Sequence, residues 1–166
     1  TKSVDKSDHP TVVRFPKGTL SGEIVAEKQL PYGDVLLDCS DPDVTIISIG
    51  ALANQVLAAA QTLRSEGYQV RVIDPVWALP INQDLVQHIA DSSLVITVED
   101  GLVAGGIGDA LAASMRADGI EIPVLNLGIP KEFLRQASRA TLLADFGLDA
   151  TSITNAVRTR LQAVVG

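Results

Sequence analysis

Short apolar runs alternate with helical segments along most of this chain, and that alternation limits the folds it can adopt. The run over 44–49, VTIISI, is almost entirely apolar and ends at Gly50. A helical pattern over 51–66 follows and stops at Gly67. Its inner face carries apolar residues at helical spacing: Leu52, Val56, Ala59 and Leu63. Strands separated by helices of this length are joined by crossovers, so they predict a parallel sheet in an α/β fold.

The same unit recurs along the rest of the chain. Further strands are predicted over 33–38, 69–74, 94–98 and 123–127. Further helices are predicted after an Asn82 N-cap, after Gly105-Gly106, over 139–146, and from about 151 to 164 beyond Gly147. We expect residues 32–166 to form the compact domain. Residues 1–31 are interpreted as a linker or arm from the end of a preceding domain, with a short strand-like run over 11–15.

Composition narrows the class of protein further. Hydrophobic residues make up 46% of the chain and aromatic residues only 4%, so the core is expected to be aliphatic, as in a sheet buried on both faces. A net charge of −7 disfavours nucleic acid and anionic membrane surfaces as partners. The lone Cys39 excludes an internal disulfide and agrees with a cytoplasmic location. The polar start without an initiator Met suggests a fragment or a processed product.

The segment 95–109, VITVEDGLVAGGIGD, predicts a strand that ends in two acids and leads through a glycine-rich loop into a helix. Its glycine spacing matches neither the dinucleotide fingerprint nor a P-loop. The glycines therefore allow two interpretations, a ligand or interface loop, or tight contact between helix and sheet. Glu99 and Asp100 are neighbours on a strand and should point to opposite faces, so a joint acid–base role is not expected. Glu99 is expected to accept hydrogen bonds from loop N–H groups or to contact a neighbouring subunit.

No catalytic constellation is visible in the residues themselves. Arg14 and Lys17 form a small basic spot in RFPKG that suits a phosphate or is simply solvated. His9 and His88 have no nucleophile near them in sequence, and Trp77 is interpreted as a core residue or an interface anchor. Two histidines and one cysteine, widely spaced, make a zinc site improbable.

Several segments, in the same order, resemble the C-terminal domain of the 1-deoxy-D-xylulose-5-phosphate synthases, thiamine-diphosphate enzymes of the transketolase superfamily. The resemblance includes RFPKG (14–18), GALANQVLAAAQTL (50–63) and VRVIDPVWALPI (70–81). It continues through VITVEDGLVAGGIGDAL (95–111) to PVLNLGIPKEFLRQASRATLLADFGLDATSI (123–153). The glycine loop also fits transketolases and the beta subunits of 2-oxoacid dehydrogenases, whereas the ending is similar to that of the synthases.

This resemblance implies a three-layer α/β/α domain with a five-stranded mixed sheet. The strand order would be 1-3-2-4-5, with the first strand, 33–38, antiparallel to the others. The order would reverse between 44–49 and 94–98, which would place Gly50 and the 99–106 loop at one crevice.

The resemblance also implies a function. The synthases join pyruvate to D-glyceraldehyde 3-phosphate with loss of CO2, on the way to isoprenoids and thiamine. Their preceding domains hold thiamine diphosphate and Mg²⁺, so this fragment is expected to bind no cofactor or metal and to be inactive alone. Arg14 matches the Arg that helps to hold the substrate phosphate, and it is the one substrate-binding residue implied here; no catalytic residue is implied.

The implied partners are the preceding catalytic domains of the same chain and a second copy in a homodimer. Two alternatives remain open at this point. One is a stand-alone α/β module that binds or senses a small molecule, and the other is the C-terminal domain of a 2-oxoacid dehydrogenase beta subunit or of a transketolase.

Overall fold

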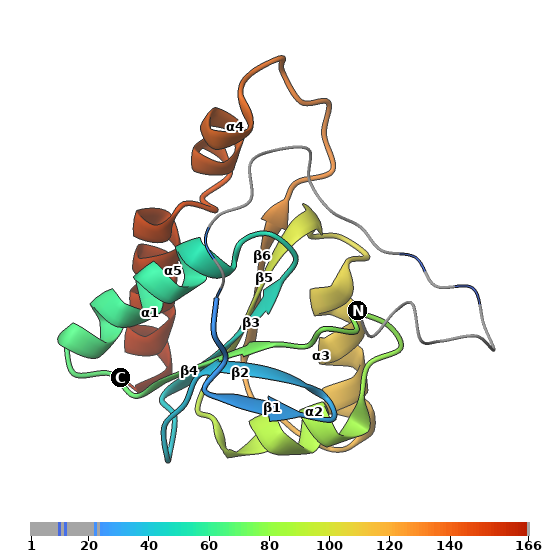
Figure 1. The fold of residues 1–166 in the computed structure, drawn as a ribbon, viewed down its shortest axis with the longest axis vertical. Helices are drawn as coiled ribbons and strands as arrows, with labels where there is room; N and C mark the ends of the chain where they lie inside the picture. The colour runs from blue at the N-terminus through green and yellow to red at the C-terminus, as the bar shows by residue number, and fades with distance from the viewer. Residues whose placement is uncertain (1–9, 11, 13–21, 23, 166) are drawn as a thin grey trace.

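The structure is a computed structural model that describes residues 10, 12, 22 and 24–165. In this part of the chain one mixed β-sheet is covered by helices on both faces (Figure 1). The strand predicted over 11–15 lies outside the described residues except for Val12. The domain boundary predicted after residue 31 stays a prediction.

The sheet has the topology that the resemblance implied. Its strands are β1 (Lys28–Leu30), β2 (Gly33–Leu37), β3 (Val44–Ile49), β4 (Val70–Asp74), β5 (Val95–Leu102) and β6 (Val124–Ile129). They lie in the order β1-β2-β4-β3-β5-β6. β2 runs antiparallel to β4, whereas β4, β3, β5 and β6 are parallel. The order and the direction of the five predicted strands are therefore confirmed.

The expected strand count of five is wrong, because β1 adds a sixth strand at the edge next to β2. Its first two residues, Lys28 and Gln29, are exposed. The segment therefore lacks the apolar alternation from which a strand is predicted. A turn at Pro31 and Tyr32 folds it back onto β2, and the pairing with β2 makes it a strand.

Helices form the two outer layers. They are α1 (Ala53–Ser65), α2 (Gln83–His88), the 3-10 helix η1 (Ile89–Asp91), α3 (Ile107–Ala117), α4 (Arg139–Asp145) and α5 (Ala150–Val165). α1 and α5 cover one face of the sheet, and α2 and α3 cover the other (Figure 1). Each face holds its own aliphatic cluster, so the predicted three-layer arrangement is confirmed.

Local signals place the helix ends where they were expected. The Asn82 side chain accepts a hydrogen bond from the Asp84 N–H and caps α2. Gly67 follows α1 with a φ of +99°, a conformation that favours glycine at the end of a helix. Ser138 caps α4 in the same way as Asn82 caps α2, with its hydroxyl accepting from the Thr141 N–H.

The parallel strands β3, β4, β5 and β6 all end at one edge of the sheet, which we call the carboxyl edge. The strand order reverses between β3 and β5, because β3 leads to β4 on one side and β5 leads to β6 on the other. The predicted switch point is thus confirmed. β5 is longer than predicted, since it continues to Leu102 with irregular pairing to β6 after Val98. No helix in the described part has both the length and the apolar composition needed to cross a membrane.

Candidate functional site

The crevice at the switch point lies between the loop after β3 and the end of β5. Gly50 has a φ of +83° there. A Cβ placed on Gly50 would come within 3.9 Å of the Asp100 Cβ, so the two segments are in contact. Open α/β sheets bind ligands at this edge, outside the carboxyl ends of their strands, at the point where the strand order reverses.

Glu99 is 4% exposed and lies at the N-terminus of α3. Its Oε2 accepts from the Ile107 N–H at 3.1 Å, and its Oε1 accepts from the Gly108 N–H at 3.2 Å. The carboxylate therefore takes two backbone donors that a bound anion would otherwise use. Backbone N–H groups thus hold Glu99, as expected, but they belong to the first turn of α3 and not to the loop before it.

The glycines of the 99–109 segment make room for these contacts. A Cβ on Gly106 would overlap the Glu99 carboxylate, and a Cβ on Gly108 would overlap the side chains of Thr97 and Asn126. α3 approaches β5 and β6 so closely that both positions require glycine. The contacts support the interpretation in which these glycines allow helix and sheet to touch.

A chain of polar contacts completes this corner. The Gly105 N–H donates to Asp109 Oδ2 at 2.7 Å, and Asn126 Nδ2 donates to Asp109 Oδ1 at 3.0 Å. Thr97 Oγ1 in turn donates to Asn126 Oδ1 at 2.9 Å. Because these groups satisfy one another, they join β5, β6 and α3 and do not present donors to a ligand.

Asp100 points away from Glu99, as expected for neighbours on a strand, and pairs with Arg139 at the start of α4. The two nitrogens Nη1 and Nη2 of Arg139 lie 3.2 Å and 3.0 Å from Oδ1 and Oδ2 of Asp100. This bidentate pair ties the end of β5 to α4, a contact between residues far apart in sequence that no local pattern predicts.

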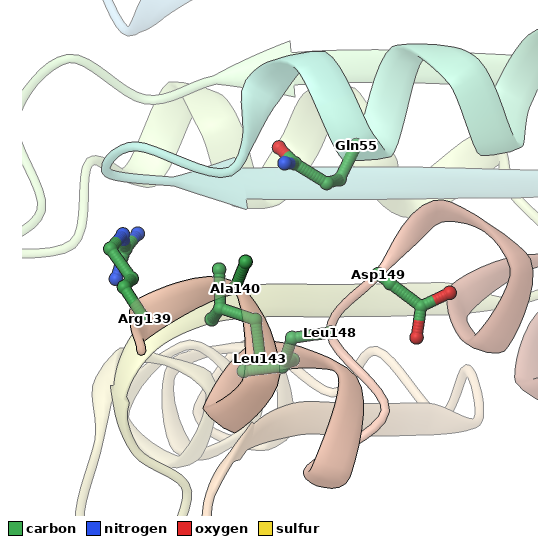
Figure 2. A pocket seen from close by; sticks show the side chains of 6 residues that line it. All are labelled: Gln55, Arg139, Ala140, Leu143, Leu148 and Asp149. Atoms are coloured by element: carbon green, nitrogen blue, oxygen red, sulfur yellow. The ribbon is translucent and has the colours of Figure 1, made fainter. Parts of the chain in front are cut away.

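A shallow groove of about 380 Å³ lies next to this ion pair, between α1 and the α4–α5 segment (Figure 2). It is lined by Gln55, Arg139, Ala140, Leu143, Leu148 and Asp149. The Asp149 carboxylate accepts the N–H groups of Thr151 and Ser152 at the start of α5. Gln55 Oε1 is buried and accepts no hydrogen bond. The groove thus offers one unused amide oxygen and no acid–base pair.

Within the described part of the chain, the other residues singled out in the sequence do not assemble into a reactive site. His88 is half-buried, with its ring centroid 5.2 Å from that of Tyr32. Burial and, after it, the positive charge of Arg71 lower the pKa of His88. Burial raises the pKa of the Cys39 thiol, so this cysteine is not activated as a nucleophile. Trp77 is partly buried in the loop after β4.

Arg71, a buried cation near the amino end of β4, was not predicted from the sequence. It is 4% exposed and donates to Asp91 at 2.7 Å and 2.9 Å and to Asp38 at 3.3 Å. Burial raises the pKa of Asp91, but the hydrogen bonds and charge of Arg71 outweigh it and leave that pKa below its usual value. The sequence signal that could have identified it is the position of an Arg inside the otherwise apolar strand VRVID, where a charged side chain needs buried partners.

A second missed group lies at the carboxyl end of β4. Burial and, after it, the nearby charge of Asp34 raise the pKa of Asp74. Asp34 stands opposite Asp74 in the antiparallel register of β2 and β4. Asp74 Oδ1 accepts from the Val76 N–H at 2.9 Å, so this carboxyl group shapes the loop that follows β4.

Arg14, Lys17 and His9 lie outside the described residues, so the assignment of substrate binding to Arg14 stays a prediction. Among the residues that are described, no three His, Cys, Asp or Glu side chains come together as metal ligands.

Comparisons with known proteins complete this description. A family model described as "Transketolase, C-terminal domain" matches residues 33–153. The 1-deoxy-D-xylulose-5-phosphate synthase of Rhodococcus jostii (strain RHA1) is 41% identical over 152 residues, which are 90% of this chain and 23% of that protein. The synthase of the same name from Corynebacterium jeikeium (strain K411) is 41% identical over 160 residues, which are 94% of this chain and 25% of that protein. The chain thus spans about a quarter of the length of these relatives.

Solved structures share the fold. One is titled "Split gene transketolase, inactive beta4 tetramer"; it is 29% identical, with a TM-score of 0.73, over 85% of this chain and 46% of that one. A transketolase from Campylobacter jejuni is similar over 83% of this chain and 20% of that one, with a TM-score of 0.60. At 15% identity it supports the fold alone.

Proposed function

Because this chain belongs to the transketolase C-terminal domain family, we propose that it is the C-terminal part of a 1-deoxy-D-xylulose-5-phosphate synthase. The observation that carries the proposal is 41% identity to a synthase of that name over 90% of the chain. Relatives with this name cover the distinctive ending of the chain as well as the glycine loop. No observation favours the stand-alone module or the 2-oxoacid dehydrogenase subunit.

In this proposal the full-length protein is a thiamine-diphosphate-dependent transferase that joins pyruvate to D-glyceraldehyde 3-phosphate with loss of CO2. The bound cofactor supplies the carbon–carbon chemistry, and the protein supplies binding and orientation. The described residues do not fit the cofactor or its Mg²⁺, because Glu99 occupies the α3 N-terminus and no metal-ligating cluster is described. We therefore assign the domain a supporting role, inactive alone. The full-length protein is proposed to be a cytoplasmic homodimer, as the resemblance to the synthases implies.

Arg14 is the residue through which this chain would touch substrate. Its guanidinium suits a phosphate because it presents paired N–H donors in a rigid plane. The test is a chimera in which this chain replaces the matched C-terminal part of the R. jostii synthase. Turnover of pyruvate and glyceraldehyde 3-phosphate by the chimera is the expected result, and loss of turnover by a folded chimera contradicts the proposal.

Within that chimera, Arg14→Ala should raise the KM for glyceraldehyde 3-phosphate by about ten-fold or more, the value of one charge-assisted contact, and leave the KM for pyruvate unchanged. Arg116→Ala, which changes an exposed Arg on α3, is the matched control. Equal effects of the two substitutions on this KM would contradict the assignment of Arg14 to the substrate site.

Isothermal titration of the 166-residue chain with thiamine diphosphate and Mg²⁺ tests the supporting role. No heat of binding is expected at micromolar concentrations. Saturable binding with a micromolar Kd would contradict the supporting role.

A further inference from the structure

The sheet ends at β6, and the outer side of this strand has no neighbour in the described chain. The Val95 N–H donates to the Pro123 carbonyl, so the backbone polar groups of every second residue from Pro123 onward face β5. The residues between them turn their N–H and C=O groups outward. These residues are Val124, Asn126 and Gly128, and we call their outward backbone groups the β6 edge. No described residue forms a hydrogen bond with the β6 edge.

The opposite edge of the sheet is protected against pairing, whereas the β6 edge is not. β1, at that opposite edge, has three residues, and its exposed Lys28 carries a charge that pairs with Asp38. Short and charged edge strands prevent sheets from associating. β6 has six residues, VLNLGI, all partly exposed and none charged. A long apolar edge with unpaired backbone groups is a template for another strand.

The β6 edge is complementary to itself. An antiparallel copy centred on Asn126 would place Val124 opposite Gly128 of the other copy and the two Asn126 residues opposite each other. Each of these pairs would exchange both of its N–H···O hydrogen bonds, because both members turn their polar groups outward. On the α1 face, Leu125 would lie opposite Leu127 of the other copy, and apolar cross-strand pairs stabilise a sheet. A two-fold axis therefore satisfies all of the outward groups.

The same axis would bring two α3 helices together. A Cβ on Gly108 would overlap Thr97 of β5 and Asn126 of β6, so α3 begins above both of these strands. Neighbouring strands lie about 4.8 Å apart, which puts the α3 axis about one strand spacing from the two-fold axis. The two helices would then lie about 10 Å apart, which is the distance between packed helices.

The side of α3 that would face the other copy carries complementary charges. Asp109 marks this side, because its carboxylate accepts from Asn126 of β6, and Ala113 and Arg116 follow at helical spacing. All three residues on this side of α3 are exposed. Within the described chain Arg116 forms no ion pair. An antiparallel α3 would place Asp109 beside Arg116 of the other copy, with the small Ala113 between them, and such complementarity favours a second copy as the partner.

We propose that the β6 edge and the adjoining side of α3 bind a second copy of this chain, so that two sheets join into one continuous sheet across a two-fold axis. A closed two-fold pair is the commonest arrangement of identical chains. The inference goes beyond the proposed function and does not depend on it, because every group that it uses lies in the described domain. A β6 edge that stays unpaired is the competing outcome.

Sedimentation equilibrium of the 166-residue chain tests the association. A dimer is expected at micromolar concentrations, and a chain that stays monomeric overturns the proposal. Ala113→Glu should weaken the dimer about ten-fold or more, because two like charges would meet at the axis, and it should leave the circular dichroism spectrum unchanged because the position is exposed. Ala58→Glu, at an exposed position of α1, is the matched control and should leave the dimer intact. Equal weakening by the two substitutions also overturns the proposal.

Amide hydrogen exchange, followed residue by residue by NMR, identifies the surface that pairs. The outward amides of Val124, Asn126 and Gly128 should exchange about ten-fold or more slowly in the wild-type dimer than in monomeric Ala113→Glu. The amides of Leu125 and Leu127, which face β5, should exchange equally in both proteins. A wild-type dimer whose outward amides exchange as fast as those of the monomeric variant is joined through another surface and overturns the proposal.

Discussion

Replacing Glu99 by Gln should lower the free energy of unfolding of this domain by about 2–4 kcal/mol. The side chain is 4% exposed, and its two carboxylate oxygens accept from the N–H groups of Ile107 and Gly108 at the start of α3. Gln has nearly the same shape, but it offers one oxygen and one NH2 group where two acceptors are needed.

The magnitude follows from these contacts. One N–H of α3 would face an NH2 group and stay unpaired, at a cost of about 1–3 kcal/mol. The surviving hydrogen bond would lose its charge, which is worth about 1 kcal/mol. The loss of a negative charge at a helix N-terminus adds about 0.3–1 kcal/mol. Relief from burying a charge offsets part of this sum, which leaves the stated range.

Urea denaturation followed by circular dichroism is the assay. Asp100→Asn, at the adjacent position, is the matched control, because Asp100 pairs with a half-exposed Arg139 and should lose no more than about 1 kcal/mol. If Glu99→Gln is no more destabilising than Asp100→Asn, the carboxylate does not organise the start of α3 and our account of this corner is wrong.

Three further outcomes are expected. Gly108→Ala should lower the free energy of unfolding, measured by urea denaturation, by about 1–3 kcal/mol, because its Cβ would overlap neighbouring side chains. Gly22→Ala is the control and should be nearly neutral, because a Cβ at Gly22 would meet no atom within 4 Å. Similar losses for the two variants would contradict the steric explanation. Arg71→Leu should lower the free energy of unfolding by about 1–3 kcal/mol, because Asp91 loses its ion-pair partner and Asp38 keeps only Lys28. A stability equal to wild type refutes that role. Stability should fall as the pH drops below about 6.5, because the pKa of His88 is lower in the folded chain and the unfolded chain binds the proton first. His88→Gln should flatten that slope between pH 7 and pH 5, and an unchanged slope assigns it to other groups.

Much of this fold could be predicted because its signals are local. The apolar run 44–49 forms β3, Asn82 caps α2, and Gly67 adopts the positive φ that ends α1. Each of these depends on a few consecutive residues and on the intrinsic preferences of their backbones. The order of the strands came from resemblance to a family, since strand propensity carries no information about which strands are neighbours.

The candidate site was only partly predictable. Hydrogen bonds from backbone N–H groups to Glu99 were expected from the residues that follow it in the sequence, although the donors lie in α3 and not in the loop. The pairs Asp100–Arg139 and Arg71–Asp38 join residues 39 and 33 positions apart, so they exist only once the sheet has formed. Sequence spacing cannot reveal such partners, because their distance is set by crossover connections and strand order.

The sequence by itself determined the α/β class, the helix ends and the aliphatic composition of the core, because these depend on periodicity and local backbone preference. The tertiary structure alone decided that 28–30 becomes an edge strand, that Glu99 closes the α3 N-terminus against anions, and that Arg71 is buried beside Asp38 and Asp91. The physical reason is that strand pairing and burial are properties of residues brought together from distant parts of the chain.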